Sequence, residues 1–327
     1  MNSPSQRQKI FAVGGAHIDR RGQMAADFVP GASIPGTMRE EIGGGAFNAL
    51  RIAVRRGVTA TLMSVRGGDG PGALVADAIA HEGIEDASAI FLDRSTPSYT
   101  ALLDRTGDVV AALADMGLYE LAFPKQMRRS KVREAIARHD AILTDANLPE
   151  PALARLVACA NGRPVYAIAI SPAKAVRLAG MLPSLSCLFM NRREAAALAA
   201  LPLHADPQSI VQALAARGIV RAVITHGGDA AIAFDEGRFW TFTPPPPRRI
   251  VDVTGAGDAI AGATVAALLR GAPFVRAVRE GVAAAMLAVE TASAVPDFTP
   301  EEFSGALALV PEPIEVAMSG ATSGAFR

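Results

Sequence analysis

Short apolar runs alternate with helical stretches along most of this 327-residue chain. An apolar run of about four to eight residues between turn signals is typical of a strand buried on both faces. Strands that alternate with helices in sequence pair in parallel, and the helices then cover both faces of the sheet. The apolar runs lie at 10–13, 61–65, 141–144, 165–170, 187–190 and 222–225. The pattern predicts an α/β fold of three layers, with a mostly parallel sheet between two layers of helices.

Two segments break the alternation. Residues 98–116 read as a β-hairpin around the turn from Asp104 to Gly107, and residues 27–41 are rich in Gly and Pro without helical periodicity. A hairpin does not belong in a parallel core, so we expect segments near 20–42 and 96–116 to form a small separate sheet, a lid over the edge of the core. We expect one domain over residues 10–312 and a flexible tail over 313–327.

The composition excludes several classes of function. The chain has 32 Lys and Arg against 32 Asp and Glu, so its formal net charge is zero and no basic surface for nucleic acid is expected. No uncharged apolar run reaches the roughly 18 residues that a membrane span needs, and residues 1–9 lack the apolar core of a signal peptide. Cys159 and Cys187 indicate neither a disulfide framework nor a metal site. We therefore expect a soluble, cytoplasmic protein.

The chemistry of the chain centres on a glycine turn, Gly255-Ala256-Gly257, followed by Asp258 at the start of a helix over residues 258–269. Glycines let a backbone approach a ligand closely, and a helix N-terminus offers unpaired N–H groups to a phosphoryl group. A carboxylate at this place can take the proton of an attacking hydroxyl. Taken alone, Asp258 is equally well explained as a helix cap.

Two longer strings make the interpretation more specific. Residues 252–258 read D-x-T-G-A-G-D, and residues 43–49 read G-G-G-A-F-N-A. These strings resemble the second and first signatures of the ribokinase-like (PfkB) family of sugar and nucleoside kinases. The resemblance covers about residues 10 to 300. It implies a ribokinase-like core with a small β-sheet lid, and transfer of the γ-phosphoryl group of ATP to a primary hydroxyl.

The resemblance also implies roles for the residues of these strings and of two shorter motifs. Asp258 is the general base, and the backbone N–H groups of Gly255, Ala256 and Gly257 form the anion hole. Asn191 and Glu194 match an N-x-x-E motif, in which Glu194 organises Mg²⁺ through water. The residues implied to bind ATP are Asn191, Thr225, Gly227, Gly228, Thr254 and Gly257. Asp252, together with Thr254, is a candidate ligand of a monovalent cation such as K⁺, as in some relatives.

At the substrate end, Asp19 matches the acidic residue that binds a pair of sugar hydroxyls. The other residues implied to contact the substrate are His17, Gly43, Gly44, Asn48, Tyr99 and Lys174. Within the family, the segments 98–104, 144–148 and 171–174 most resemble those of pseudouridine kinases. Lys174 then falls near the pyrimidine base, and the reaction is phosphorylation of the 5′-hydroxyl of pseudouridine.

Three departures from the family pattern lie near the substrate end. His17 stands where relatives usually have Asn, Phe47 where pseudouridine kinases often have Arg, and Ile168 where an Asp is common. Other acceptors therefore remain open: adenosine, ribose or a fructose derivative. A catalytically silent sugar- or nucleoside-binding protein on the same fold is a further alternative. An uncovered edge of the lid sheet would favour a homodimer through that sheet.

Overall fold

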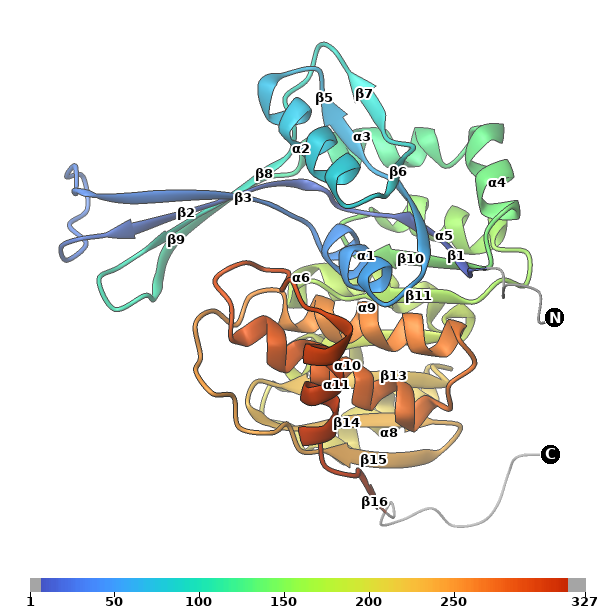
Figure 1. Ribbon diagram of the computed structural model, residues 1–327. Coiled ribbons are helices and arrows are strands. Elements are labelled where there is room, and N and C mark those ends of the chain that lie inside the picture. The colour runs from blue at the N-terminus through green and yellow to red at the C-terminus, as the bar shows by residue number, and fades with distance from the viewer. Residues whose placement is uncertain (1–6, 317–327) are drawn as a thin grey trace.

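The computed structural model describes residues 7–316, which build a central sheet of ten strands between two layers of helices (Figure 1). From one edge to the other, the sheet runs β16 (Ile314–Val316), β15 (Arg238–Phe242), β14 (Asp229–Asp235), β13 (Arg221–His226), β12 (Cys187–Asn191), β11 (Val165–Ile168), β10 (Ala141–Asp145), β1 (Lys9–Val13), β4 (Thr59–Met63) and β6 (Glu85–Asp86). The predicted three-layer α/β fold is thereby confirmed.

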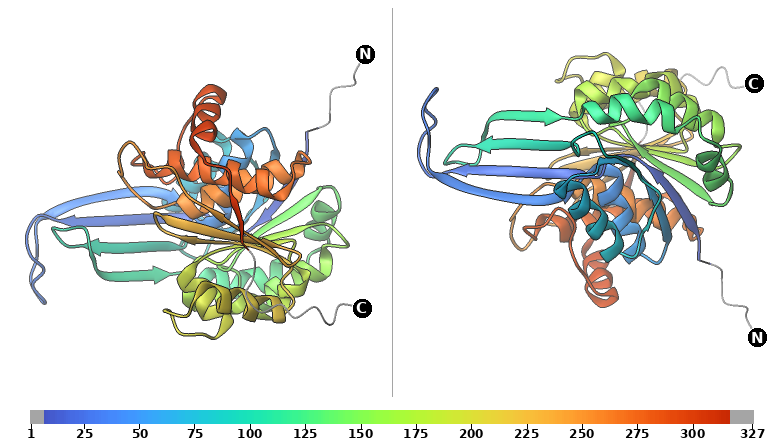
Figure 2. Two further views of the ribbon diagram at one scale, coloured as in Figure 1. Left: turned by 90° about the horizontal axis from the view of Figure 1, so that it is seen from below. Right: turned by 90° about the horizontal axis from the view of Figure 1, so that it is seen from above.

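Each face of the sheet is covered by its own set of helices and has its own apolar core (Figure 2). One core includes residues of α1 (Gly45–Arg55), α2 (Gly70–His81), α9 (Ala256–Leu269), α10 (Phe274–Val289) and α11 (Pro300–Leu309). The other includes residues of α3 (Gly117–Gln126), α4 (Ser130–Ala137), α5 (Glu150–Cys159), α6 (Pro172–Ala175), the 3₁₀ helix η1 (Val176–Ser184), α7 (Arg192–Ala199) and α8 (Pro207–Ala216).

The strands from β6 to β13 pair in parallel, whereas β14, β15 and β16 extend the sheet in antiparallel fashion. The sequence pattern did not reveal these last three strands. β16 also occupies the beginning of the segment expected to be a flexible tail, since residues 314–316 pair with β15. The rest of that expected tail, residues 317–327, lies outside the described residues.

The chain reverses its direction of growth across the sheet at β1. It adds β4 and then β6 on one side of β1, and returns to place β10 on the other side. In an open parallel sheet, the carboxyl ends of two strands at such a reversal lie beside a crevice where ligands bind. The segments after β1 and β10 are therefore the first place to look for a site.

A separate four-stranded sheet, called here the small sheet, extends away from the core on one side (Figure 1). Its strands, in order, are β3 (Gly36–Gly43), β2 (His17–Met24), β8 (Ser98–Leu103) and β9 (Val109–Asp115). It combines the two segments that broke the sequence alternation. A further short pair, β5 (Val65–Gly67) with β7 (Ala89–Phe91), lies next to α2. Within residues 7–316, no helix is both long and apolar enough to cross a membrane.

The contact between α1 and α9 positions both glycine segments, and it depends on Gly262. A Cβ atom at Gly262 would lie 2.2 Å from the carbonyl oxygen of Ala49 and 2.9 Å from the Cβ of Ile52. The two helices can therefore approach this closely only because position 262 has no side chain. The small residues of α9 thus have a packing role in addition to any role in binding.

We predict that Gly262→Ala lowers the free energy of unfolding by about 1–3 kcal/mol, because α1 and α9 must move apart. Gly305→Ala is the matched control: Gly305 is an exposed helical glycine with no atom within 4 Å of an added Cβ. There the substitution should stabilise by about 0.5–1 kcal/mol. Urea unfolding of the three proteins measures both changes, and equal effects at the two positions would contradict the packing argument.

Candidate active site

The site begins where the turn after β1 meets the end of β10. Asp145, the last residue of β10, is fully buried and accepts hydrogen bonds of 2.9 Å from the backbone N–H groups of Gly15, Ala46 and Asn147. One carboxylate therefore joins the turn after β1, the first turn of α1 and the segment after β10. The family resemblance included the segment 144–148, but it implied no role for Asp145.

The glycines before α1 lie against Asp19 and the turn after β1. A Cβ atom at Gly43 would lie 1.9 Å from a carboxylate oxygen of Asp19, and one at Gly44 would lie 2.2 Å from the carbonyl oxygen of Gly15. Gly44 also has a φ of 115°, a conformation that strongly favours glycine. Both predicted glycines are thus needed for the close approach of Asp19 and of the turn after β1.

Asp258 lies in the first turn of α9, and Asn48 of α1 points to it. The side-chain amide of Asn48 donates a 2.9 Å hydrogen bond to Oδ2 of Asp258, while the Oδ1 of Asn48 is buried without a protein partner. Gly255, at φ 79°, precedes the helix, and a Cβ there would lie 2.0 Å from the carbonyl oxygen of Ala294. The two signature segments, about 210 residues apart in sequence, therefore meet at one carboxylate.

The environment of Asp258 favours its protonated form. Burial is the main cause that raises the pKa of Asp258, to about 7, although the hydrogen bond from Asn48 opposes the shift. The negative charges of Asp145, Asp19 and Glu194 raise it further. A carboxyl group with a pKa near neutrality can both accept and release a proton under physiological conditions.

His17, Asp19 and Tyr119 form a connected group beside the glycines. Nε2 of His17 lies 3.2 Å from Oδ1 of Asp19, and Nδ1 lies 3.1 Å from the hydroxyl of Tyr119. That hydroxyl accepts a hydrogen bond from the N–H of Ala16 and donates one to its carbonyl. Asp19 lies within β2 of the small sheet. Tyr99 is its register partner on β8.

Lys174, in α6, donates a 2.6 Å hydrogen bond to Oδ1 of Asn147. Burial lowers the pKa of Lys174, and the negative charges of Asp145 and Asp19 oppose this. The Nδ2 of Asn147 is buried with no protein partner. Nearby, Ile170 has a φ of 70°, a strained conformation for a β-branched residue, and its Cδ1 lies where a side chain on Gly45 would fall.

Phe47 and Ile168, two of the three departures from the family pattern, are both core residues. Both belong to the buried apolar cluster on one face of the sheet. They therefore bear on substrate choice less directly than their place in the sequence suggested. The third, His17, takes part in the site through Asp19 and Tyr119.

Four of the six residues predicted to bind ATP lie at or just beyond the ends of β12 and β13: Asn191, Thr225, Gly227 and Gly228. Asn191 and Thr225 are register partners there. Asn191 caps α7 in a capping box with Glu194, whose two carboxylate oxygens accept hydrogen bonds from the backbone and side-chain N–H groups of Asn191. Burial raises the pKa of Glu194, against these hydrogen bonds. Beyond β13, added Cβ atoms at Gly227 and Gly228 would meet nothing within 4 Å, so this turn faces open space.

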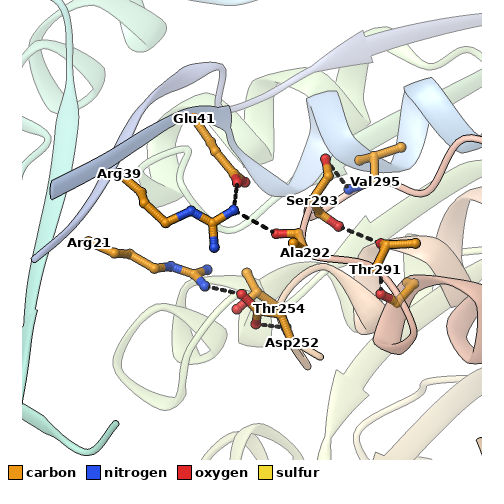
Figure 3. Close-up of polar contacts among 10 residues, drawn as sticks. Arg21, Arg39, Glu41, Asp252, Thr254, Thr291, Ala292, Ser293 and Val295 are labelled. Atoms are coloured by element: carbon orange, nitrogen blue, oxygen red, sulfur yellow. Dashed lines mark hydrogen bonds and ion pairs between the residues drawn. The ribbon is translucent and has the colours of Figure 1, made fainter. Parts of the chain in front are cut away.

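Asp252 and Thr254 lie immediately before the glycine turn. The N–H of Thr254 donates a 2.8 Å hydrogen bond to Oδ1 of Asp252, and Arg21 of the small sheet donates to Oδ2 (Figure 3). Nothing in the sequence pointed to Arg21. Tyr119 was also missed, because its partners lie more than 100 positions away in sequence and no local pattern connects them.

Comparisons with known proteins agree with this arrangement. A model of the pfkB family carbohydrate kinases matches residues 7–301. The pseudouridine kinase of Escherichia coli (strain K12) is 28% identical over 277 residues, which cover 84% of this chain and 88% of that protein. A solved carbohydrate kinase from Agrobacterium tumefaciens is 43% identical, with a TM-score of 0.83 over 94% of this chain and 100% of that one.

A solved ribokinase of Arabidopsis thaliana, complexed with ribose and ATP, is 21% identical, with a TM-score of 0.82 over 92% of this chain and 99% of that one. At this identity the likeness concerns the fold. Fold and family together define a phosphotransferase that acts on a hydroxyl group. The chain belongs to the PfkB family of carbohydrate kinases.

The pKa of Asp258 leads to a prediction about stability. The folded-state pKa, about 7, lies above the ordinary value of 3.8, so the folded protein binds the extra proton near pH 5 and loses that stabilisation as the pH rises towards 7. Asn carries no charge to desolvate. The stability of Asp258→Asn relative to the wild type should therefore increase by about 1–3 kcal/mol between pH 4.5 and pH 8.

Urea unfolding at several pH values measures this difference. Asp93→Asn, at a carboxylate that is 77% exposed, is the control, and its stability relative to the wild type should change little between pH 4.5 and pH 8. A difference between Asp258→Asn and the wild type that stays constant with pH would mean that Asp258 titrates near its ordinary value.

Proposed function

We propose that this protein is an ATP-dependent kinase that phosphorylates the 5′-hydroxyl of a ribonucleoside, with pseudouridine as the preferred acceptor. The observation that carries the proposal is Asp258, a carboxyl group with a pKa near 7 in the first turn of α9, hydrogen-bonded to Asn48. A base with this pKa, next to a helix N-terminus, suits proton transfer from a hydroxyl to which a phosphoryl group is being added.

The reaction proceeds in one displacement. The acceptor oxygen forms a bond to the γ-phosphorus of ATP, the bond from that phosphorus to the bridging oxygen of ADP breaks, and the hydroxyl proton passes to Asp258. Negative charge on the transferring oxygens is stabilised by the N–H groups of Gly255, Ala256 and Gly257, the first of which is held in position by its close contact with Ala294.

The nucleotide end fits ATP with Mg²⁺. Thr225, Gly227 and Gly228 border open space at the end of β13, where phosphates can approach the backbone. Each oxygen of Glu194 already accepts one hydrogen bond from Asn191 and retains capacity for a metal-bound water. Mg²⁺ supplies charge neutralisation of the phosphates. Among the described residues, no group of three or more His, Cys, Asp or Glu could hold a metal ion, so the phosphates would be its main ligands.

The substrate end fits a nucleoside better than a free sugar. Asp19, fixed by His17 and Gly43, can accept both hydrogens of a ribose diol. Lys174 and the unpartnered Nδ2 of Asn147 are two adjacent donors, which suit the carbonyl oxygens of a pyrimidine base. Free ribose has no group to reach them. The pseudouridine kinase of Escherichia coli among the relatives adds support for this acceptor.

The test is release of ADP with ATP and Mg²⁺ against pseudouridine, uridine, adenosine, ribose and fructose 6-phosphate. We expect the highest kcat/KM with pseudouridine. A preference for another acceptor would leave the kinase assignment in place and replace the substrate. No turnover with any of them would favour the silent binding protein.

We predict that Asp258→Asn lowers kcat by at least about 100-fold, because the variant cannot accept the hydroxyl proton. Its affinity for an ATP analogue, measured by calorimetry, should stay within about threefold of the wild type, which shows that the site still forms. The exposed substitution Asp93→Asn is again the control. Normal turnover by Asp258→Asn would remove Asp258 from the role of base.

We also propose that the protein is a homodimer through the small sheet. The face of this sheet opposite to Asp19 exposes Met38 and Leu113, which are 57% and 70% accessible. A second copy is the occupant that this family resemblance favours. A cytoplasmic location stays a prediction from the sequence.

Sedimentation should then give twice the chain mass of 33.9 kDa. Leu113→Glu is expected to give a monomer, because a carboxylate cannot be buried in an apolar interface. Leu92→Glu, at an 88% exposed residue outside the small sheet, should leave the dimer intact. A monomeric wild type would end this part of the proposal.

A further inference from the structure

Two arginines of the small sheet face the loops that flank the glycine turn (Figure 3). Arg21 of β2 and Arg39 of β3 are register partners, so two positive side chains lie directly opposite each other. Such a pair is unfavourable by itself and needs acceptors nearby. Arg21 pairs with Asp252, and Arg39 reaches Glu41 at 3.3 Å and the carbonyl oxygen of Ala292 at 3.5 Å.

The pairing of Arg21 bears on the expected cation site at Asp252. A monovalent cation there would need the negative charge of the Asp252 carboxylate, which no other cation must already balance. Oδ1 of Asp252 accepts the N–H of Thr254, and Oδ2 accepts from Arg21. The carboxylate thus already has a cationic partner in Arg21.

The loop of residues 291–294 also lies beside the glycine turn and contacts Arg39. The carbonyl of Ala292 lies 3.5 Å from the guanidinium of Arg39, and the hydroxyl of Thr291 lies within hydrogen-bond distance of the carbonyls of both Ser293 (3.0 Å) and Ala288 (3.1 Å). The next carbonyl, that of Ala294, packs against Gly255. Because Arg21 already balances the charge of Asp252, the residues present do not fit a bound K⁺ at this carboxylate while that pairing stands.

The guanidinium group of Arg21 supplies the positive charge that a bound cation would supply at Asp252. It carries one positive charge at any physiological pH, and it fixes the carboxylate of Asp252 through a directional hydrogen bond. Asp252 in turn holds the N–H of Thr254, the residue directly before Gly255. Arg21 thereby sets the position of the turn whose N–H groups face the phosphoryl group.

We propose that Arg21 takes the place of a monovalent cation at Asp252, so that it positions the anion hole and makes the enzyme independent of K⁺. This inference rests on the proposed function, because the anion hole is defined by phosphoryl transfer. Arg21 acts through Asp252 and Thr254 and is a positioning residue, not a catalytic one.

The experiment compares KCl with tetramethylammonium chloride at equal ionic strength. The wild type should have the same kcat in both salts. Arg21→Ala should lose about 10- to 100-fold in kcat in tetramethylammonium chloride, and K⁺ should restore part of it, because Asp252 is then free to bind the ion. The control is Arg20→Ala, on the other face of β2, which pairs with Glu40 and should behave like the wild type.

Thermal unfolding gives a readout that needs no acceptor. K⁺ should raise the melting temperature of Arg21→Ala above its value in tetramethylammonium chloride, and should leave the wild type unchanged. If Arg21→Ala does not fold, Arg21→Gln removes the charge with less loss of packing and receives the same tests. If no acceptor is phosphorylated at all, the proposed function fails, while the melting data still test the pairing at Asp252.

Three results would overturn the inference. One is activation or thermal stabilisation of the wild type by K⁺. Another is an Arg21 variant with normal kcat in tetramethylammonium chloride. The last is a folded Arg21 variant that gains neither activity nor thermal stability from K⁺.

Discussion

The site depends on the buried carboxylate of Asp145. Its three backbone hydrogen bonds tie the turn after β1 and the first turn of α1 to the end of β10. A buried charge is tolerated only when such donors compensate for the loss of water. This requirement fixes the start of α1, and through it the place of Asn48. The Asn48–Asp258 hydrogen bond then follows from the packing of α1 against α9 at Gly262.

The same cluster of carboxylates accounts for the chemistry of the site. Burial raises the pKa of Asp258 to about 7, and the negative charges of Asp145, Asp19 and Glu194 add to this effect. Asp145 accepts three hydrogen bonds and Glu194 accepts two, whereas Asp258 accepts one, from Asn48. The carboxyl group proposed to receive a proton is thus less compensated than either of these two. Proximity of several acidic residues is useful here because their hydrogen bonding differs.

Much of the core was predictable from sequence, because alternating apolar runs and helices determine a parallel sheet with two helical layers. The sequence also placed the glycine turn of Gly255 directly before a helix that begins near Asp258, as α9 does. The antiparallel strands β14, β15 and β16 were missed, because β14 and β15 follow β13 without an intervening helix and β16 is an edge strand of three residues. Tyr119 and Arg21 were missed because their contacts join distant segments through side chains that have no local signature.

Strand β2 carries residues of both halves of the proposed site: Asp19 for the sugar, and Arg21 beside the anion hole. His17, Asp19 and Arg21 alternate along it and therefore share one face of the small sheet. Alternate residues of a strand lie about 7 Å apart, so one rigid element sets the spacing between the carboxylate proposed for the sugar and the guanidinium beside the anion hole. A cation bound from solution would hold the glycine turn whatever the position of the small sheet. An arginine on β2 holds it only when the same strand has also brought Asp19 into place, so the proposed acceptor site and the proposed anion hole would form together.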